Sequence, residues 1–467
     1  MAASLEIMNM DPERRILWEV AEEHLDEAAF LFERWDHALD SPLYRLDELA
    51  GSFEARTLAH IEGLAAGGQP VRARLLEPLI GDTEADPGQA VIAAAMLLNN
   101  ASSEDCGSVL EVLDGLDGFA SLDEAARAHW RALTRAVELS ERPGLVEWLG
   151  WGLSERAGPG LATRLRGLAA RGVVADARAV AWLNDDDPAV VAAACHLARG
   201  SQDPAVLDAL RGPLMAEALG PRLAALDAAC VTRPAPIFSW VLELAWAGEG
   251  QLRERARLWA ALLGGAGVHA RLLAAVMGAG VADLKPASLW PLAFTGRLAA
   301  VDFAVELMAH QDLEPDLARA AGELCSHIAG LPEDDRYWLR EDEDEDADEN
   351  EDEDEDEPEL EVELVPGPIA DLRLPNPDEV RSWWAGARAQ LDERRRYLGG
   401  VAMDGERFMA ALRTLPCRRR HPLSLELAAR SGGQRLLDTR VFSRRQYAQL
   451  EQLAQLPAID PQASLAS

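Results

Sequence analysis

Lysine is almost missing from this chain: 44 of its 45 basic residues are arginine, and Lys285 is the only lysine. Because Pro286 follows Lys285, the Gly-Lys-Ser/Thr step of a P-loop does not occur, and no strand pattern offers the lysine of a protein kinase. The sequence therefore excludes a Walker-type ATPase and a kinase. Arginine replaces lysine everywhere rather than at chosen positions, which is typical of a GC-rich genome and indicates no function by itself.

Cysteine and long apolar runs are scarce as well. The five cysteines lie far apart and form no C-x-x-C pair, which excludes a zinc ribbon and a disulfide framework. The first ten residues lack the pattern of a signal peptide, and the longest apolar run, residues 272–282, is far shorter than the ~20 residues that span a bilayer. We therefore expect a cytoplasmic protein without membrane insertion.

Familiar catalytic motifs are also missing. Neither H-E-x-x-H nor G-x-S-x-G occurs, and no His-Glu dipeptide supplies the iron ligands of HEAT-repeat hydroxylases. We expect no enzymatic activity, no cofactor and no bound metal. The formal charge of −35 argues against a general binder of nucleic acid, because that partner is also negatively charged.

Three isolated features have both a functional and a structural interpretation. His24 and His60 fall on two helices of a predicted hairpin, where a metal site is conceivable but a hydrogen-bonded pair is favoured. Cys417 precedes three arginines that would lower a thiol pKa, yet His421 is the only histidine nearby, so a reactive role is not favoured. Residues 264–267 (Gly-Gly-Ala-Gly) follow no strand, which indicates a turn between helices rather than a phosphate loop.

What the chain does contain is helix. Leu, Ala, Arg and Glu recur at spacings of three and four residues, while alternating β-branched segments are nearly absent. Amphipathic stretches recur at intervals of roughly 30–37 residues, which leaves room for a second helix in each interval. Their predicted starts lie near Pro87, Leu122, Pro159, Pro188, Pro221, Leu252, Pro286 and Pro315.

This repeat of amphipathic helical stretches predicts an all-α fold. One helical pair cannot bury its own apolar face, so repeated pairs stack into an α-solenoid. Asp187-Pro188 followed by an Ala/Val run resembles the second helix of HEAT repeats, whereas the tetratricopeptide pattern fits less well. We expect HEAT-like helical pairs, preceded by an N-terminal helical hairpin and followed by a small helical C-terminal cap.

Composition sets the predicted boundaries. The hairpin takes residues 1–70 and the solenoid 71–335, and an acidic disordered linker follows at 336–368, in which 18 of residues 341–363 are acidic. A basic helical region covers 369–455 and a flexible tail 456–467. Between positions 381 and 445 there are 15 arginines and 6 acidic residues. The arginines either bind an acidic partner or neutralise the acidic linker, and we favour the second interpretation.

Candidate partner-binding residues come from two groups of side chains. The 13 tryptophans are scattered roughly one per helix, which favours core packing, but a few of them are candidate anchors for a partner protein. The arginine triplets would add electrostatic recognition of an acidic partner. The complete candidate set is Trp148, Trp151, Trp383, Trp384, Arg394, Arg395, Arg396, Arg418, Arg419 and Arg420.

Both ends of the chain contain a recognisable pattern: His24 to Arg34 with Asp47, Arg56, His60, Gly63 and Leu64 near the start, and Arg396 to Gly399 and Gly433 to Arg435 near the end. With these residues the chain resembles a proteobacterial family of uncharacterised proteins with degenerate HEAT-like repeats. Genes of that family often lie near type VI secretion genes, which implies an adaptor or chaperone for secretion effectors or spike components. The acidic segment resembles an insertion that the family does not require.

The sequence thus favours a non-catalytic, protein-binding scaffold. An immunity-like or purely structural role differs from an adaptor only in its partner, so both alternatives stay open. The competing hypothesis is a HEAT-like nucleic-acid-binding protein or base glycosylase that uses the Arg-rich C-terminal region as its contact surface. Against it, the predicted solenoid is acidic, whereas a DNA-reading face is basic.

Overall fold

The computed structural model describes residues 16–100, 103–116, 118–232, 234–339 and 369–465. Helix accounts for 69% of the structure, and the described residues contain almost no strand, which confirms the all-α prediction. The first 15 residues of the predicted hairpin, the acidic linker from position 340 onward and the last two residues of the tail lie outside the described part.

The chain divides into two compact units. Unit 1 comprises the chain up to Leu39, Arg45–Ile237 and Ser424–Leu456, and unit 2 comprises Asp40–Tyr44, Phe238–Leu423 and Pro457–Ser467. The division falls within helices α17 (Pro234–Ala247) and α25 (Cys417–Arg430). The residues predicted as one C-terminal region, 369–455, are therefore shared between the two units.

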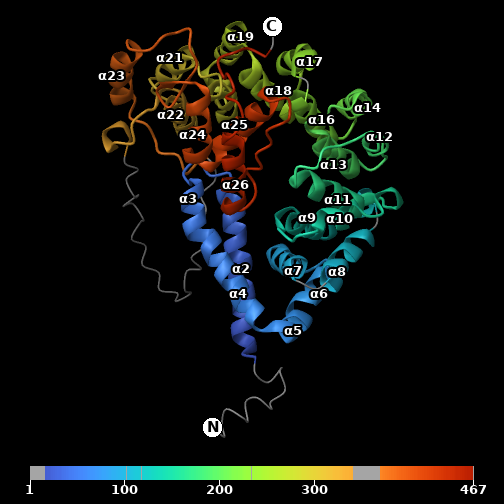
Figure 1. The fold of residues 1–467 in the computed structure, drawn as a ribbon. Coiled ribbons are helices and arrows are strands. Elements are labelled where there is room, and N and C mark those ends of the chain that lie inside the picture. Colours follow the sequence, from blue (N-terminus) through green and yellow to red (C-terminus); the bar gives the residue numbers. More distant parts are fainter. Residues whose placement is uncertain (1–15, 101–102, 117, 233, 340–368, 466–467) are drawn as a thin grey trace, which may run out of the picture. The chain divides into compact units, whose positions relative to one another are not determined.

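Unit 1 opens with a long helical hairpin, in which α2 and α4 pack along each other as predicted and α2 also packs on α7. Figure 1 shows this hairpin in blue. A π-helical turn at Ala50–Glu54 leads into the second arm. The helices of the first half of unit 1 are α2 (Trp18–Ala38), α3 (Leu46–Leu49), α4 (Ala55–Ala66), α5 (Gly68–Val71), α6 (Glu77–Gly81), α7 (Pro87–Asn99) and α8 (Ser103–Asp114).

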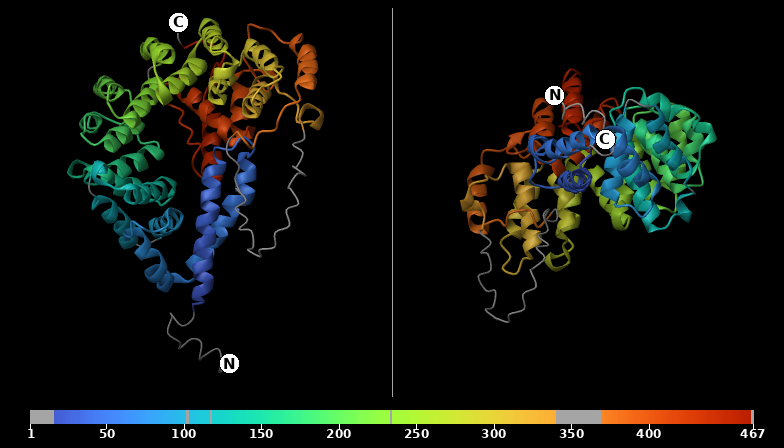
Figure 2. Two further views of the ribbon diagram at one scale, coloured as in Figure 1. Left: turned by 180° about the vertical axis from the view of Figure 1, so that it is seen from behind. Right: turned by 90° about the horizontal axis from the view of Figure 1, so that it is seen from below.

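Alternate helices of unit 1 form a stack in chain order: α7 packs on α9, α9 on α11, α11 on α13 and α13 on α16. Figures 1 and 2 show them as successive blue to green helices. Their alanine-rich sequences are buried on most sides, as expected for helices covered by neighbours. The remaining helices of unit 1 are α9 (Glu124–Leu139), α10 (Leu145–Gly150), α11 (Gly158–Ala170), α12 (Ala179–Leu183), α13 (Pro188–Ala198), α14 (Pro204–Ala209), α15 (Arg211–Leu214), α16 (Leu219–Thr232) and α26 (Ser443–Ala454).

The eight predicted helix starts are confirmed to within two residues. Two of these starts, at Pro87 and Pro188, have proline at the first helical position and an aspartate before it, which suits a helix start because proline needs no N–H partner there and the carboxylate accepts an N–H of the first turn. The side chain of Asp86 accepts from the Gln89 N–H, and that of Asp187 accepts from the Ala189 N–H, both at 2.8 Å.

Unit 2 repeats the same kind of packing, since α18 packs on α20 and α20 on α22. A two-stranded antiparallel ribbon is added, whose tight turn uses Gly399 and Gly400 at φ +60° and +77°, a conformation that favours glycine. The elements of unit 2, besides its parts of α17 and α25, are α18 (Gly250–Leu263), α19 (Ala266–Met277), α20 (Pro286–Ala293), α21 (Leu298–Leu307), α22 (Pro315–Ala329), α23 (Pro377–Arg388), β1 (Tyr397–Leu398), β2 (Val401–Ala402) and α24 (Gly405–Thr414).

In unit 1, the C-terminal segment (Ser424–Leu456) binds the ends of the stacked helices. The guanidinium of Arg445 donates to the carbonyls of Glu138 and Ala170, in the last turns of α9 and α11. These carbonyls have no partner within their own helices and carry the negative end of the helix dipole, so a cation suits them. Arg171 lies beside them, and its burial, together with the charge of Arg445, lowers its pKa to about 10.

The same segment closes a buried polar network around Glu54 in unit 1. One oxygen of this carboxylate accepts from the Trp35 indole N–H and from the Ser443 backbone N–H, both at 2.9 Å, and the other accepts from the Ser443 hydroxyl. Phe442 stacks on Trp35 with 4.6 Å between ring centroids. Burial raises the pKa of Glu54, although these hydrogen bonds oppose the shift.

In unit 2 the ribbon covers other helix ends. The N–H groups of Gly399 and Gly400 donate to the carbonyls of His327 and Ile328 near the end of α22. Residues on either side of the stretch 340–368, which lies outside the described part, pair in unit 2: the N–H of Leu339 donates to the carbonyl of Leu374, and that of Asn376 to the carbonyl of Tyr337, both at 2.8 Å, around an antiparallel bridge of Trp338 and Pro375. We call this pairing the closing ladder.

Among the described residues, no helix combines the length and the apolar character needed to cross a bilayer.

Candidate protein-binding surface

The four candidate tryptophans divide into two exposed and two packed side chains. Trp384 is buried in unit 2, where its indole N–H donates to Asp302 at 2.8 Å, and Trp383 is half-buried between Trp384 and Tyr337. These two side chains stabilise the packing of α23 and offer a partner little surface. Trp148 and Trp151 in unit 1 are 40% and 73% exposed.

The short helix α10 displays the two exposed rings because of its spacing. Leu145 and Leu149, four residues apart, face inward and are buried, so Val146 and Trp148 point outward. Trp151 follows the last helical turn, just before Gly152 at φ +67°. We call Val146, Trp148 and Trp151 the α10 surface. Such a cluster of large exposed apolar side chains is typical of an interaction site.

Beneath the α10 surface lies an ionic network that fixes its position. Asp114, at the end of α8, binds Arg164 of α11 at 2.8 Å and Arg156 at 2.6 Å. Arg164 also donates to the carbonyl of Trp148 at 2.9 Å, so one guanidinium joins α8, α10 and α11. Arg164 is almost fully buried, and removing its partner would leave an uncompensated charge. The two rings are therefore presented on a rigid base.

The sequence singled out Trp148 and Trp151 as candidate partner-binding residues, but it did not predict the ionic network of Asp114, Arg156 and Arg164 beneath them. A signal was present, because Arg164 occupies the apolar face of its helix, three residues after Leu161 and four before Leu168. An arginine on a core face needs buried hydrogen-bond acceptors, and a carboxylate on a neighbouring helix is one group that can supply them. Nothing in the local sequence shows that Asp114 is that acid.

The predicted arginine clusters are largely internal. Arg396 and Arg420 are 1% and 0% exposed, and Arg419 is also buried. Arg396 donates to the carbonyls of Thr295, Phe294 and Pro461, and Arg420 to that of Leu412. These three guanidinium groups therefore offer no free cationic surface to a partner, which corrects the prediction for them. Arg394 and Arg395 are exposed.

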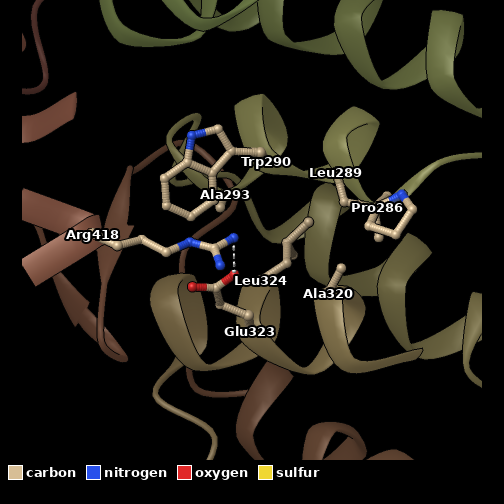
Figure 3. A pocket seen from close by; sticks show the side chains of 8 residues that line it. All are labelled: Pro286, Leu289, Trp290, Ala293, Ala320, Glu323, Leu324 and Arg418. Carbon is tan, nitrogen blue, oxygen red and sulfur yellow. Dashed lines mark ion pairs between the residues drawn. The ribbon is translucent and has the colours of Figure 1, made fainter. Parts of the chain in front are cut away.

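Arg418 lines a small hollow in unit 2, shown in Figure 3. Its guanidinium lies 4.4 Å from the ring centroid of Trp290 and binds Glu323 at 3.0 Å, while Arg419 binds the same carboxylate at 3.3 Å. Burial lowers the pKa of Arg418, although Glu323 opposes the shift. The space open to water is about 10 Å³, enough for about one water molecule. The hollow therefore has no room for a substrate or cofactor.

The hairpin brings His24 and His60 together as predicted, with 3.0 Å between their Nδ1 atoms. The Nδ1–H of one ring donates a hydrogen bond to the Nδ1 of the other, so the two atoms are each other's hydrogen-bond partner. Gly63 lies against His24, where a Cβ would come within 2.7 Å of Nε2. Among the described residues, no three His, Cys, Asp or Glu side chains gather in a way that could hold a metal ion.

The two remaining candidate features, Cys417 and the glycine-rich stretch at 264–267, are parts of the packed fold. Cys417 is buried at the start of α25, where its backbone N–H donates to Tyr44. In the glycine-rich stretch at 264–267, residues 264 and 265 form the turn between α18 and α19, as the sequence indicated, and residues 266 and 267 begin α19.

In comparisons with known proteins, no protein-family profile, curated protein or solved structure matches the chain. The resemblance described from the two ends of the sequence therefore stays a prediction.

Proposed function

We propose that this protein is a non-catalytic scaffold that binds another protein through the α10 surface. The observation that carries the proposal is the exposure of Trp148 and Trp151 on a base held by the ion pairs of Asp114 with Arg156 and with the buried Arg164. Tryptophans that are rigidly presented are the side chains that most often dominate binding free energy in interfaces. Ordering them on binding adds little entropic cost, because the backbone beneath them is already fixed.

The architecture that we propose is an α-solenoid of HEAT-like pairs. The chain-order stack of alternate helices in unit 1, and the similar packing in unit 2, support it. By the family resemblance, the role would be that of an adaptor or chaperone, and the partner a type VI secretion effector or spike component. The nucleic-acid alternative loses much of its basis, since Arg396, Arg419 and Arg420 are internal.

An affinity pull-down of the tagged full chain from a lysate of its own cells tests the proposal. We expect one or two stoichiometric proteins, captured equally with and without nuclease. The double substitution Trp148→Ala/Trp151→Ala removes them, whereas Met215→Ala, at another exposed apolar position of unit 1, does not. Failure to capture any stoichiometric protein would contradict the scaffold role, and loss of all partners on nuclease treatment would favour the nucleic-acid alternative.

A further inference from the structure

Five of the other eleven tryptophans have a partner that the α10 surface lacks. In both units, arginines of this chain stack on indole rings, with 4.2 Å to 5.4 Å between the guanidinium carbon and the ring centroid. The pairs are Arg74 on Trp18, Arg135 on Trp35, Arg271 on Trp246, Arg418 on Trp290 and Arg373 on Trp338. Within the described residues, no arginine stacks on Trp148 or Trp151. These two exposed indole rings therefore carry no arginine of the described residues.

The charges around these rings have one dominant sign. Glu147, Glu155 and Glu111 are exposed on and beside α10 and on α8. The two arginines that adjoin the surface, Arg156 and Arg164, are both bound to Asp114. Unit 1 as a whole contains 40 acidic and 25 basic residues. A cationic ligand is thus favoured at short range by the exposed rings and at long range by the acidic unit.

From these observations we propose that the α10 surface binds a basic segment of the partner, in which arginine or lysine side chains alternate with apolar ones. The cations stack on Trp148 and Trp151 and pair with Glu147 and Glu155, and the apolar side chains cover Val146. This inference rests on the proposed function and adds the chemistry of the docking segment. It reverses the expectation from the sequence, in which basic residues of this chain recognise an acidic partner.

Two labelled synthetic peptides test the proposal with the full chain by fluorescence anisotropy: one alternates leucine and arginine, and the other alternates leucine and glutamate. We expect the arginine peptide to bind and the glutamate peptide not to bind. Trp148→Ala/Trp151→Ala weakens binding at least about tenfold, as for interface anchors. Glu147→Gln/Glu155→Gln weakens it by a smaller factor and flattens its salt dependence. Met215→Ala is the matched control and leaves the affinity unchanged.

The proposal is overturned if the arginine peptide fails to bind the wild-type chain, if both peptides bind equally, or if the double tryptophan variant binds as well as the control. A benzophenone amino acid in place of Trp151, used in the pull-down, separates this proposal from the scaffold role. A cross-linked partner segment rich in arginine or lysine supports the docking chemistry. A partner that is captured but contacts position 151 through an acidic segment leaves the scaffold role standing and contradicts the basic segment.

Discussion

The buried carboxylate of Glu54 gives the sharpest test of how the C-terminal segment is held in unit 1. Replacing it by alanine leaves two donors without an acceptor, the Trp35 indole N–H and the Ser443 backbone N–H, both in buried residues. An unsatisfied buried donor destabilises by about 1–3 kcal/mol, so Glu54→Ala is expected to lower the free energy of unfolding by about 2–6 kcal/mol. The Ser443 hydroxyl can rotate to another acceptor and adds less.

Glu54→Gln keeps the geometry and removes the charge. The amide oxygen can accept from both N–H groups that now share one carboxylate oxygen, and the amide nitrogen can donate to the Ser443 hydroxyl. The pKa of Glu54 is raised, so the folded state keeps the proton at pH values where the unfolded chain has lost it. The contribution of Glu54 to the free energy of unfolding is thus fully present below the ordinary pKa of a glutamate, and it is lost as the pH rises through the raised pKa of the folded state. The glutamine variant gains on the wild type as pH rises from about 4 to 7.

Urea unfolding followed by circular dichroism at both pH values measures these differences. Glu62→Ala, at an exposed position of α4, the helix that follows Glu54, is the control and is expected to change the free energy of unfolding by less than about 0.5 kcal/mol. If Glu54→Ala were as mild as this control, the network would not hold the segment. If Glu54→Gln were as damaging as Glu54→Ala, the charge rather than the hydrogen-bond geometry would be essential.

Two further predictions concern the chain path. Deleting residues 341–363 is expected to leave the thermal unfolding midpoint unchanged, because the closing ladder already joins the residues on either side of the deletion. Loss of the cooperative unfolding transition in calorimetry would refute this expectation. Gly433→Ala is expected to lower the free energy of unfolding by about 2–5 kcal/mol, because the new Cβ would lie 2.1 Å from the Cα of Gly200. Gly172 has a similar φ but no atom within 4 Å of such a Cβ, so Gly172→Ala is expected to lower it by only about 1–2 kcal/mol. Equal effects of the two glycine substitutions in urea denaturation would show that the close approach is relaxed.

The sequence is informative wherever structure depends on neighbours along the chain. Asp187-Pro188 specifies a helix start through its own hydrogen bonds, and the spacing of Leu145 and Leu149 decides which side of α10 is exposed. The partners of the C-terminal arginines are different, because they are backbone carbonyls that lie far away in sequence. A carbonyl is present in every residue and leaves no compositional trace, so a run of arginines looks the same whether it is exposed or buried.

Residues Arg394 to Arg396 illustrate this limit. All three look alike in sequence, yet only the third enters the core, because it leads into the ribbon strand β1. The near-exclusive use of arginine, which codon usage explains in general, has a local structural consequence at this position. A guanidinium presents several N–H groups in a fixed planar fork, whereas the ammonium of lysine is a point.

This difference yields a final prediction. In unit 2, the Nε, Nη1 and Nη2 atoms of Arg396 donate to three carbonyls, those of Thr295, Pro461 and Phe294, at 3.1, 2.6 and 2.9 Å. Lysine cannot reach all three from one nitrogen, so Arg396→Lys leaves at least one buried carbonyl unsatisfied and is expected to lower the free energy of unfolding by about 2–4 kcal/mol. Arg395→Lys, at the exposed neighbouring position, changes it by less than about 0.5 kcal/mol in the same urea titration. If both substitutions were neutral, positive charge alone would suffice at position 396, and the fork geometry would not be what holds the ribbon to the end of α20.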